Sequence, residues 1–316
     1  MTDQACSRDG VRHHHADFDV ADLIAARERR GTTVSVVIPA LNEQGRVGRV
    51  AEVLRRSVVE EAPLVDELLV IDGGSHDDTM AEAERAGARV VRQSDVLPHL
   101  GDAPGKGEAL WKGLAATTGD IVLFVDGDIL DIGPRFAVGL LGPLLTDDSI
   151  AFTKAAYDRP LQIGDEQRPT GGGRVTELMA RPLLATFWPE LAWLAQPLSG
   201  EYAGRRELLE SIPFVQGYGV EIAMLIDIVG RHGSDVIAQV DLERREHDHQ
   251  DLASLGRMSA EILHVTLDRL ARDSRAVMTD ALGTHLRQPL RGPDGLELVD
   301  HEITVRERPP LASVAV

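Results

Sequence analysis

The feature that most constrains the fold of this chain is the alternation of short apolar runs with longer amphipathic segments. Val34–Ile38 is a β-branched run that predicts a buried strand ending at Pro39. A helix is expected from about Gln44 to Val59, and a second strand from Glu67 to Ile71. The segments ARVVRQ and DIVLFVDGD continue the pattern. This alternation predicts a mainly parallel, doubly wound α/β sheet, whose ligands collect at the carboxyl ends of the strands.

The second half of the chain has a weaker pattern. Strands are expected in SIAFTKAAYDRPL and VIAQVDLERREHDHQ, and a long helix in LASLGRMSAEILHVTLDRLAR. Residues 1–17 are polar and contain His13, His14 and His15, so we expect a disordered tail in which these histidines are incidental. An amphipathic helix is expected at Val20–Arg30. The last thirty residues are rich in proline and charge, and we expect them to wrap around the surface or a partner subunit.

Composition limits the classes of function. The 316 residues carry a net charge of −18, which argues against binding to nucleic acid or to a membrane surface, because both need a basic face. The single cysteine, Cys6, allows neither a disulfide within the chain nor a cysteine metal cluster. No apolar run reaches the ~18 residues that span a membrane, and the first thirty residues do not resemble a signal peptide. We expect a cytoplasmic protein.

Asp126, Gly127 and Asp128 follow the buried run IVLFV. Residues i and i+2 of a strand point to the same side, so the two carboxylates converge at the end of the strand. Hard divalent cations prefer oxygen ligands and keep positions for diphosphate oxygens. A bare D-x-D is more often a pair of solvent-facing turn aspartates, but the buried strand before this pair favours a metal site.

Three further segments carry polar groups suited to metals or anions. His247 and His249 share a strand face and suit a borderline metal such as Mn²⁺ or Co²⁺, or are polar residues at a strand end. Lys106 lies beside an expected helix start in PGKGEALW, which favours phosphate oxygens, although the segment fails the P-loop pattern. Arg174 and Thr176 follow the glycines of TGGGRVTEL, which suits a small phosphorylated or carboxylated acceptor; a flexible loop with a capping threonine is the alternative.

Four single residues complete the set of candidates. Asp72 and Gly73 follow the second strand, without the G-x-G-x-x-G spacing of a dinucleotide site. Glu43 and Glu221 are candidates for contacts to sugar or ribose hydroxyls. Each of these residues is nonspecific when taken alone.

Taken together, SVVIPALNE, VIDGGSHDDT, GKGEALW, GDIVLFVDGD, TGGGRVTEL, QPLSGEYAGRRELL and GYGVEI, followed by H-x-H and LGRMS, resemble the glucosyl-3-phosphoglycerate synthases of actinobacteria. The resemblance runs from about Thr33 to Ser259, in order and with matching spacing. These are retaining glycosyltransferases of the Rossmann-like GT-A fold, close kin of mannosyl-3-phosphoglycerate synthases. The resemblance implies a GT-A domain at residues 18–250, with a nucleotide-sugar half at about 33–130 and an acceptor half at about 150–250. A C-terminal helix and extension would occupy 251–316.

The implied reaction transfers glucose from a nucleoside diphosphate, with UDP-glucose favoured, to the 2-hydroxyl of D-3-phosphoglycerate. The product, glucosyl-3-phosphoglycerate, is a precursor of glucosylglycerate. The implied metal is Mg²⁺ or Mn²⁺, with Co²⁺ as a further option, and the C-terminal extension suggests a homodimer. The alternatives are a mannosyl-3-phosphoglycerate synthase that uses GDP-mannose, a nucleotidyltransferase, and a non-catalytic sugar-nucleotide binding protein.

The resemblance also implies site residues by position. Asp128 and His247 would bind the metal, and Asp128, Lys106 and Glu221 would act in catalysis. The donor would contact Pro39, Ala40, Leu41, Glu43, Asp72, Gly73, Lys106, Asp126, Gly127, Tyr218 and Glu221. The phosphate or carboxylate of the acceptor would contact Gly173, Arg174, Val175, Thr176 and His249. The family usually has serine at the positions of Gly73 and Gly127 and asparagine at that of His249, so two hydroxyls beside the donor are missing here.

Retention of the anomeric configuration requires a covalent intermediate or attack on the same face as the leaving group. Glu221 is the only carboxylate near the expected position of a nucleophile. We therefore expect same-face attack, in which the leaving diphosphate takes the proton of the acceptor while the metal and Lys106 stabilise the diphosphate.

Overall fold

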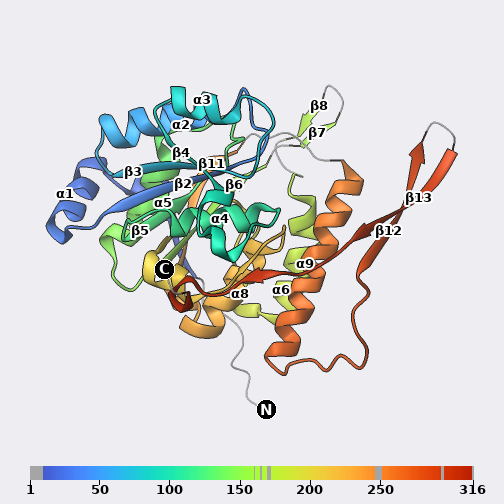
Figure 1. Cartoon of the computed structure of the whole chain (residues 1–316). Helices are drawn as coiled ribbons and strands as arrows, with labels where there is room; N and C mark the ends of the chain where they lie inside the picture. The colour runs from blue at the N-terminus through green and yellow to red at the C-terminus, as the bar shows by residue number, and fades with distance from the viewer. Residues whose placement is uncertain are drawn as a thin grey trace, which may run out of the picture.

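The computed structural model describes residues 10–159, 161–163, 166–168, 172–245, 251–292 and 295–314. Its centre is an eight-stranded sheet in the order β1-β11-β6-β9-β5-β2-β3-β4 (Figure 1). Its strands are β1 (Val11–His14), β2 (Val34–Ala40), β3 (Glu67–Asp72), β4 (Arg89–Arg92), β5 (Ile121–Phe124), β6 (Phe152–Asp158), β9 (Tyr202–Arg205) and β11 (Ile237–Arg244). Only β9 pairs antiparallel, with β5 and β6. The predicted mainly parallel α/β fold is confirmed.

Helices cover both faces of the sheet (Figure 1). Buried side chains of α1, α2, α3 and α5 pack on one face, and those of α4, α6, α7, α8 and α9 on the other. Their bounds are α1 (Val20–Arg30), α2 (Val47–Leu54), α3 (Thr79–Arg85), α4 (Lys106–Ala115), α5 (Pro134–Thr146), α6 (Arg181–Phe187), α7 (Arg206–Ser211), α8 (Val220–His232) and α9 (Leu252–Arg272). The helix expected at 44–59 is α2 followed by the π-helical turn η2 (Arg55–Glu60). No helix of the described ranges is long and apolar enough to cross a membrane.

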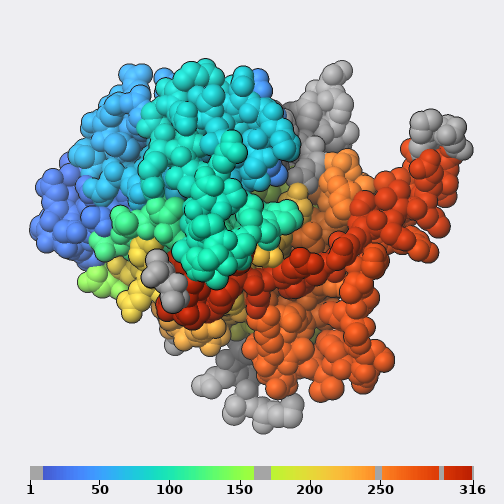
Figure 2. All heavy atoms as spheres, viewed as in Figure 1, coloured from blue at the N-terminus to red at the C-terminus, as the bar shows by residue number. Residues whose placement is uncertain are grey.

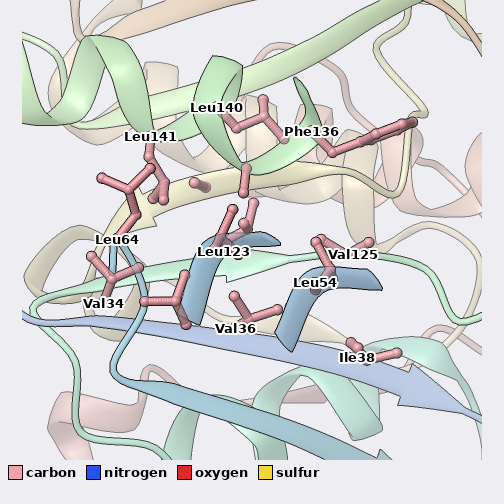
Figure 3. Close-up of a cluster of buried hydrophobic side chains, with 14 of the residues drawn as sticks. Val34, Val36, Ile38, Leu54, Leu64, Leu123, Val125, Phe136, Leu140 and Leu141 are labelled. Carbon is pink, nitrogen blue, oxygen red and sulfur yellow. The ribbon is translucent and has the colours of Figure 1, made fainter. Parts of the chain in front are cut away.

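The central strand β2 shows why two layers of helices are needed. Val34, Val36 and Ile38 are fully buried on the face that α2 and α5 cover (Figure 3), and Val37 is fully buried on the opposite face, against α4. A strand buried on both faces belongs at the centre of a parallel sheet. The strand continues two residues beyond its predicted end. Pro39 is tolerated because pairing with β5 has already stopped at Val37.

The prediction of a disordered tail is wrong for the part of it that the structure describes. Val11–His14 form β1, which pairs parallel with β11 at the edge of the sheet, and residues 15–17 form a 3-10 turn. The His15 Nε2 lies 3.2 Å from the Glu243 Oε1, and the Nδ1 of His14 accepts the amide hydrogen of Ala16. His15 therefore ties this segment to β11, while His14 stabilises the turn that follows β1. The segment escaped prediction because a short polar strand has no apolar periodicity. Residues 1–9 lie outside the described ranges.

The C-terminal part of the chain returns to the main domain. After α9, the hairpin of β12 (His285–Gly292) and β13 (Gly295–Glu302) extends from the body (Figure 1). The chain then runs back, and β14 (Glu307–Arg308) pairs antiparallel with β10 (Phe214–Val215). A separate small hairpin joins β7 (Leu161–Ile163) to β8 (Glu166–Arg168). Of the last thirty residues, which we expected to wrap around the surface, the segment after the hairpin returns to the main domain, whereas the hairpin itself projects.

Candidate active site

A cleft of about 810 Å³ opens where β2, β3 and β5 end. Most of the residues predicted for the site line this cleft. They are Pro39, Ala40, Leu41, Glu43, Gly73, Lys106, Asp126, Gly127, Asp128, Gly173, Arg174, Val175, Thr176, Tyr218 and Glu221. The structure therefore brings together the expected donor and acceptor residues from segments almost 200 positions apart in the sequence.

Lys106 forms the cationic centre of the cleft. It is the first residue of α4, and its Nζ lies 2.6 Å from the Asp126 Oδ1 and 2.9 Å from the Glu221 Oε1. Burial opposes the charge on this lysine, but the carboxylates of Asp126 and Glu221 together outweigh it and hold the pKa of Lys106 well above its usual range. Lys106 is therefore a permanent cation at the start of a helix, where anions are already favoured.

The two glycines beside Lys106 allow α4 to begin against a neighbouring backbone. The Gly107 N–H donates to the carbonyl of Gln216 at 3.0 Å, and a Cβ on Gly107 would overlap the carbonyl oxygen of Val215. Gly105 has φ +116°, which a residue with a side chain rarely adopts. The sequence GKG is therefore required by packing against the end of β10. It is not a modified P-loop.

A buried arginine that was not predicted links the acidic groups. The NH2 of Arg245 lies 3.2 Å from the Asp126 Oδ2, 3.2 Å from the Asp128 Oδ1 and 3.1 Å from the Glu201 Oε1. Glu201 is fully buried and also accepts a hydrogen bond of 2.6 Å from the Tyr157 hydroxyl. Burial opposes the charge on Arg245, but Glu201 and the other nearby acids raise its pKa above the usual range. Arg245 offsets the repulsion between the two aspartates.

Gly200 and Lys154 fix the other side of Asp126. A Cβ on Gly200 would overlap the Asp126 carboxylate, so only glycine fits in the LSGEY segment at this point. The preceding carbonyl, that of Ser199, accepts a hydrogen bond of 2.6 Å from the Nζ of Lys154. Burial lowers the pKa of Lys154 to about 7, although the carboxylate of Glu221 opposes this shift.

The predicted acceptor loop lies across the cleft from the nucleotide side. Gly173 has φ +73°, and the Gly172 N–H donates to the carbonyl of Arg159 at 3.0 Å. Arg159 also lines the cleft, so it stands beside Arg174 as a second cation. Val175 is buried and helps to anchor the loop in the core. The loop and the end of β6 thus offer two arginines to an anion.

Two predicted donor residues differ in what their carboxylates do. Glu43 lines the cleft, and its burial together with the charge of Asp128 raises its pKa to about 7. Asp72 does not line the cleft. It is buried and accepts hydrogen bonds from the N–H groups of Gly74 and Ser75, at 3.0 and 3.1 Å. Asp72 therefore shapes the turn that presents Gly73. The geometry does not support a direct contact between Asp72 and the donor.

His247 and His249 lie outside the described residues, so their predicted roles stay predictions. Sequence reasoning missed Arg245, although the rule that paired His247 with His249 places residue 245 on the same face. It also missed wall residues that come from distant segments and carry no local motif. They include Arg159, Gln216, Glu261, Glu302, Thr304 and Arg306.

The donor set at the end of β5 fits a hard divalent cation. Asp126 and Asp128 offer carboxylate oxygens at one point, and a single cationic nitrogen of Arg245 already contacts both. That nitrogen shows that the two carboxylates face one positive centre. Asp128, with His247 from the adjoining segment, is the predicted ligand pair.

Comparison with known sequences identifies the type of enzyme. The model of glycosyl transferase family 2 matches residues 35–133. The glucosyl-3-phosphoglycerate synthase of Petrotoga mobilis is 46% identical over 303 residues, which is 95% of this chain and 93% of that protein. The enzyme of the same name from Mycobacterium tuberculosis is 47% identical over 304 residues, with 94% of this chain and 90% of that protein covered.

Comparison with solved structures indicates the same family. The mannosyl-3-phosphoglycerate synthase of Rubrobacter xylanophilus is similar with a TM-score of 0.89 at 38% identity, over 96% of this chain and 97% of that one. The M. tuberculosis glucosyl-3-phosphoglycerate synthase, solved with Mn²⁺, UDP and phosphoglyceric acid, gives a TM-score of 0.84 at 44% identity, over 96% and 98%. These relatives align with this chain over nearly its full length, so the alignment includes the segments that form the cleft. The chain belongs to the glucosyl-3-phosphoglycerate synthase family of GT-A glycosyltransferases.

Proposed function

We propose that this enzyme transfers glucose from UDP-glucose to the 2-hydroxyl of D-3-phosphoglycerate, with retention of the anomeric configuration. The observation that carries the proposal is one cleft in which the carboxylate pair, Lys106 and the glycine–arginine loop meet. The M. tuberculosis glucosyl-3-phosphoglycerate synthase, 43% identical to this chain, has been solved with Mn²⁺, UDP-glucose and phosphoglyceric acid. The shared fold and motifs support the same pair of substrates here.

The donor occupies the ends of the parallel strands. Pro39, Ala40, Leu41 and Glu43 hold the uridine, and Gly73 and Gly127 let the backbone approach it. Asp126 and Lys106 line the diphosphate, while Tyr218 and Glu221 face the glucose. Glu221 is buried beside Lys106, which suits a hydrogen bond to a sugar hydroxyl.

Asp128 and His247 would hold Mg²⁺ or Mn²⁺, which when bound would neutralise charge on the departing diphosphate. Lys106 would donate to the same diphosphate from the start of a helix whose dipole favours negative charge. Because Lys106 is already charged and fixed between two carboxylates, it needs no proton transfer to act.

The acceptor binds at the glycine–arginine loop. The Gly173 backbone, Arg174, Val175 and Thr176 hold the phosphate or carboxylate of 3-phosphoglycerate, and the resemblance adds His249 to this set. This orients the 2-hydroxyl toward the anomeric carbon. Positioning of two substrates in this way is worth several kcal/mol, about 7–11 in the best intramolecular models.

The bond changes balance without a further reactant. The bond between the anomeric carbon and the β-phosphate oxygen breaks, and its electron pair leaves with UDP. The 2-hydroxyl oxygen then bonds to the anomeric carbon from the same face, and its proton passes to the leaving diphosphate. Glu221 is occupied by Lys106 at 2.9 Å, which disfavours it as a covalent nucleophile and supports same-face attack.

A second candidate function is mannosyl-3-phosphoglycerate synthesis from GDP-mannose. The TM-score with the R. xylanophilus mannosyl-3-phosphoglycerate synthase, 0.89, exceeds the 0.84 for the M. tuberculosis glucosyl enzyme. A donor panel of UDP-glucose, GDP-glucose and GDP-mannose with 3-phosphoglycerate separates the two. We expect nucleoside diphosphate release to be fastest with UDP-glucose, and faster turnover of GDP-mannose would establish the second candidate.

A parallel reaction with UTP and glucose 1-phosphate addresses the other classes of protein. A nucleotidyltransferase would release pyrophosphate from UTP, and a non-catalytic binding protein would bind UDP-glucose without turnover. Colorimetric assay of pyrophosphate beside that of nucleoside diphosphate distinguishes all three. We expect nucleoside diphosphate alone.

We further propose a cytoplasmic homodimer. Leu296 and Leu298 lie on one face of the projecting hairpin and are 66% and 65% exposed, which is costly for an isolated two-stranded ribbon. A second copy that covers this face would remove the cost. Light scattering of the L296S/L298S variant is expected to give a monomer, whereas an unchanged mass would exclude this face as the dimer contact.

A further inference from the structure

The last segment of the chain starts at the wall of the cleft and then runs along α4. We call residues 303–313 the C-terminal strap; Thr304 and Arg306 line the cleft, and Figure 2 shows the strap passing below α4. Its backbone pairs with β10 through β14, and the Pro309 carbonyl accepts a hydrogen bond of 3.0 Å from the Nε1 of Trp111 in α4. The strap thus connects α4, which begins at Lys106, with β10, whose end packs against the start of α4.

Arg308 of the strap binds a buried carboxylate in a fork. Its Nε lies 2.7 Å from the Glu108 Oε2, and its NH2 lies 2.6 Å from the Glu108 Oε1. The remaining N–H groups donate to the carbonyls of Leu100 and Gly101, at 2.8 and 3.1 Å. Glu108 is fully buried, and its nearest other cation, Lys112, is 4.0 Å away. Arg308 therefore supplies the main counter-charge of this carboxylate.

Glu108 lies in the first turn of α4, two residues after Lys106. The Nε2 of Gln216 donates to the Glu108 Oε2 at 3.1 Å, and the backbone carbonyl of Gln216 accepts from Gly107. The Gln216 N–H in turn donates to the carbonyl of Arg306 in the strap at 2.9 Å. Lys106 is thus enclosed by bonded neighbours whose common anchor is the strap.

We propose that Arg308, acting through Glu108, is a positioning residue that fixes Lys106 against the diphosphate. The strap is then part of the catalytic apparatus, although it lies about 170 residues beyond the region that the family model matches. The proposal rests on the role of Lys106 in the proposed function.

A double-mutant cycle tests this coupling. We expect K106M to lower kcat by about 100- to 1,000-fold, and R308M to lower it by roughly 100-fold, because a shift of about 1 Å at Lys106 costs this much. If Arg308 acts through Lys106, K106M/R308M will have the kcat of K106M within about twofold. A merely structural role would lower the melting temperature and leave the two effects on kcat multiplicative, which would overturn the proposal.

The chain supplies a matched control. Arg287 binds Asp300 in the same forked geometry, at 2.7 and 2.8 Å, but on the exposed hairpin. We expect R287M to keep wild-type kcat within about twofold. Should R308M fail to fold, E108Q/R308M removes both charges and leaves no unpaired carboxylate; its kcat must still fall roughly 100-fold.

The outcomes distinguish a failure of the role of Arg308 from a failure of the role of Lys106. Wild-type kcat in R308M, with K106M impaired, would overturn only the role of Arg308. Wild-type kcat in K106M would overturn the catalytic role of Lys106 and this proposal with it. Hydrogen exchange gives a second readout: R308M should increase the exchange of the backbone amides of residues 106–109, and R287M should not.

Discussion

The two walls of the cleft are built in different ways. The nucleotide wall consists of residues at or just after the ends of β2, β3 and β5, so the backbone of one regular sheet sets their positions. The opposite wall is assembled from a strand end, the start of a helix and the C-terminal strap. There the geometry depends on buried ion pairs, notably Arg245 with Glu201 and Arg308 with Glu108. The first wall should tolerate the loss of a single charge far better than the second.

The largest effect is expected at the tip of the nucleotide wall. Asp128→Ala removes a predicted metal ligand without disturbing the sheet, and should lower kcat at least ~1,000-fold with little change in melting temperature. Steady-state kinetics with and without added Mn²⁺ measures this. Asp148→Asn, an exposed aspartate far from the cleft, is the control. Full activity of the Asp128 variant without added metal would refute the assignment.

A change in the opposite wall should instead damage stability as well as activity. Arg245→Met leaves Glu201 and both aspartates without their shared cation, and removal of one partner of a buried pair typically costs ~3–5 kcal/mol. Urea denaturation measures the free energy of unfolding. A loss of less than ~1 kcal/mol would show that this wall is no more sensitive than the first.

The addition of one methyl group at Gly107 tests the packing where the two walls meet. Gly107→Ala would force the start of α4 away from Val215 and displace Lys106, which should lower kcat roughly 30- to 100-fold. Gly230→Ala, in the open face of α8, meets no atom within 4 Å and should stabilise the helix slightly. Equal kinetics of the two variants would contradict the packing account.

The smallest effect concerns Lys154, beneath the cleft. Burial lowers its pKa from 10.5 to about 7, so between these values the unfolded chain binds one more proton than the folded one. Stability attributable to Lys154 therefore rises with pH above 7, and at pH 7 or below the buried charge is destabilising. Relative to Lys154→Met, the wild type should gain about 2 kcal/mol between pH 7 and 9. A difference independent of pH would show that the lysine stays charged.

Sequence reasoning worked where local patterns determine structure. The apolar runs of β2, β3 and β5 placed the strands, and the strand ends then placed Pro39, Gly73 and Asp126 at one edge. Helices α1 and α9 have the predicted bounds because their amphipathic patterns are complete. Asp72 was the exception on this wall: whether a carboxylate faces a ligand or its own turn depends on a side-chain rotation that no pattern encodes.

The rest of the site depends on pairings between distant residues. Arg308 meets Glu108 across 200 positions, and Arg245 meets Asp126 across 119. Periodicity assigns each residue to a face but gives no register between such segments. The prediction also missed the edge strand β1 for this reason. Its structure depends on pairing with β11 and on the contact with Glu243 rather than on its own apolar content.

Proton NMR of one reaction mixture tests the central claim most directly. UDP-glucose, 3-phosphoglycerate and Mg²⁺ are incubated with the enzyme, and the anomeric proton of the product is observed beside free UDP. The account predicts equimolar UDP and a new α-anomeric signal, which appears only when both substrates are present. A β-anomeric product would contradict same-face transfer, and release of free glucose without a glycosylated phosphoglycerate would contradict the proposed function.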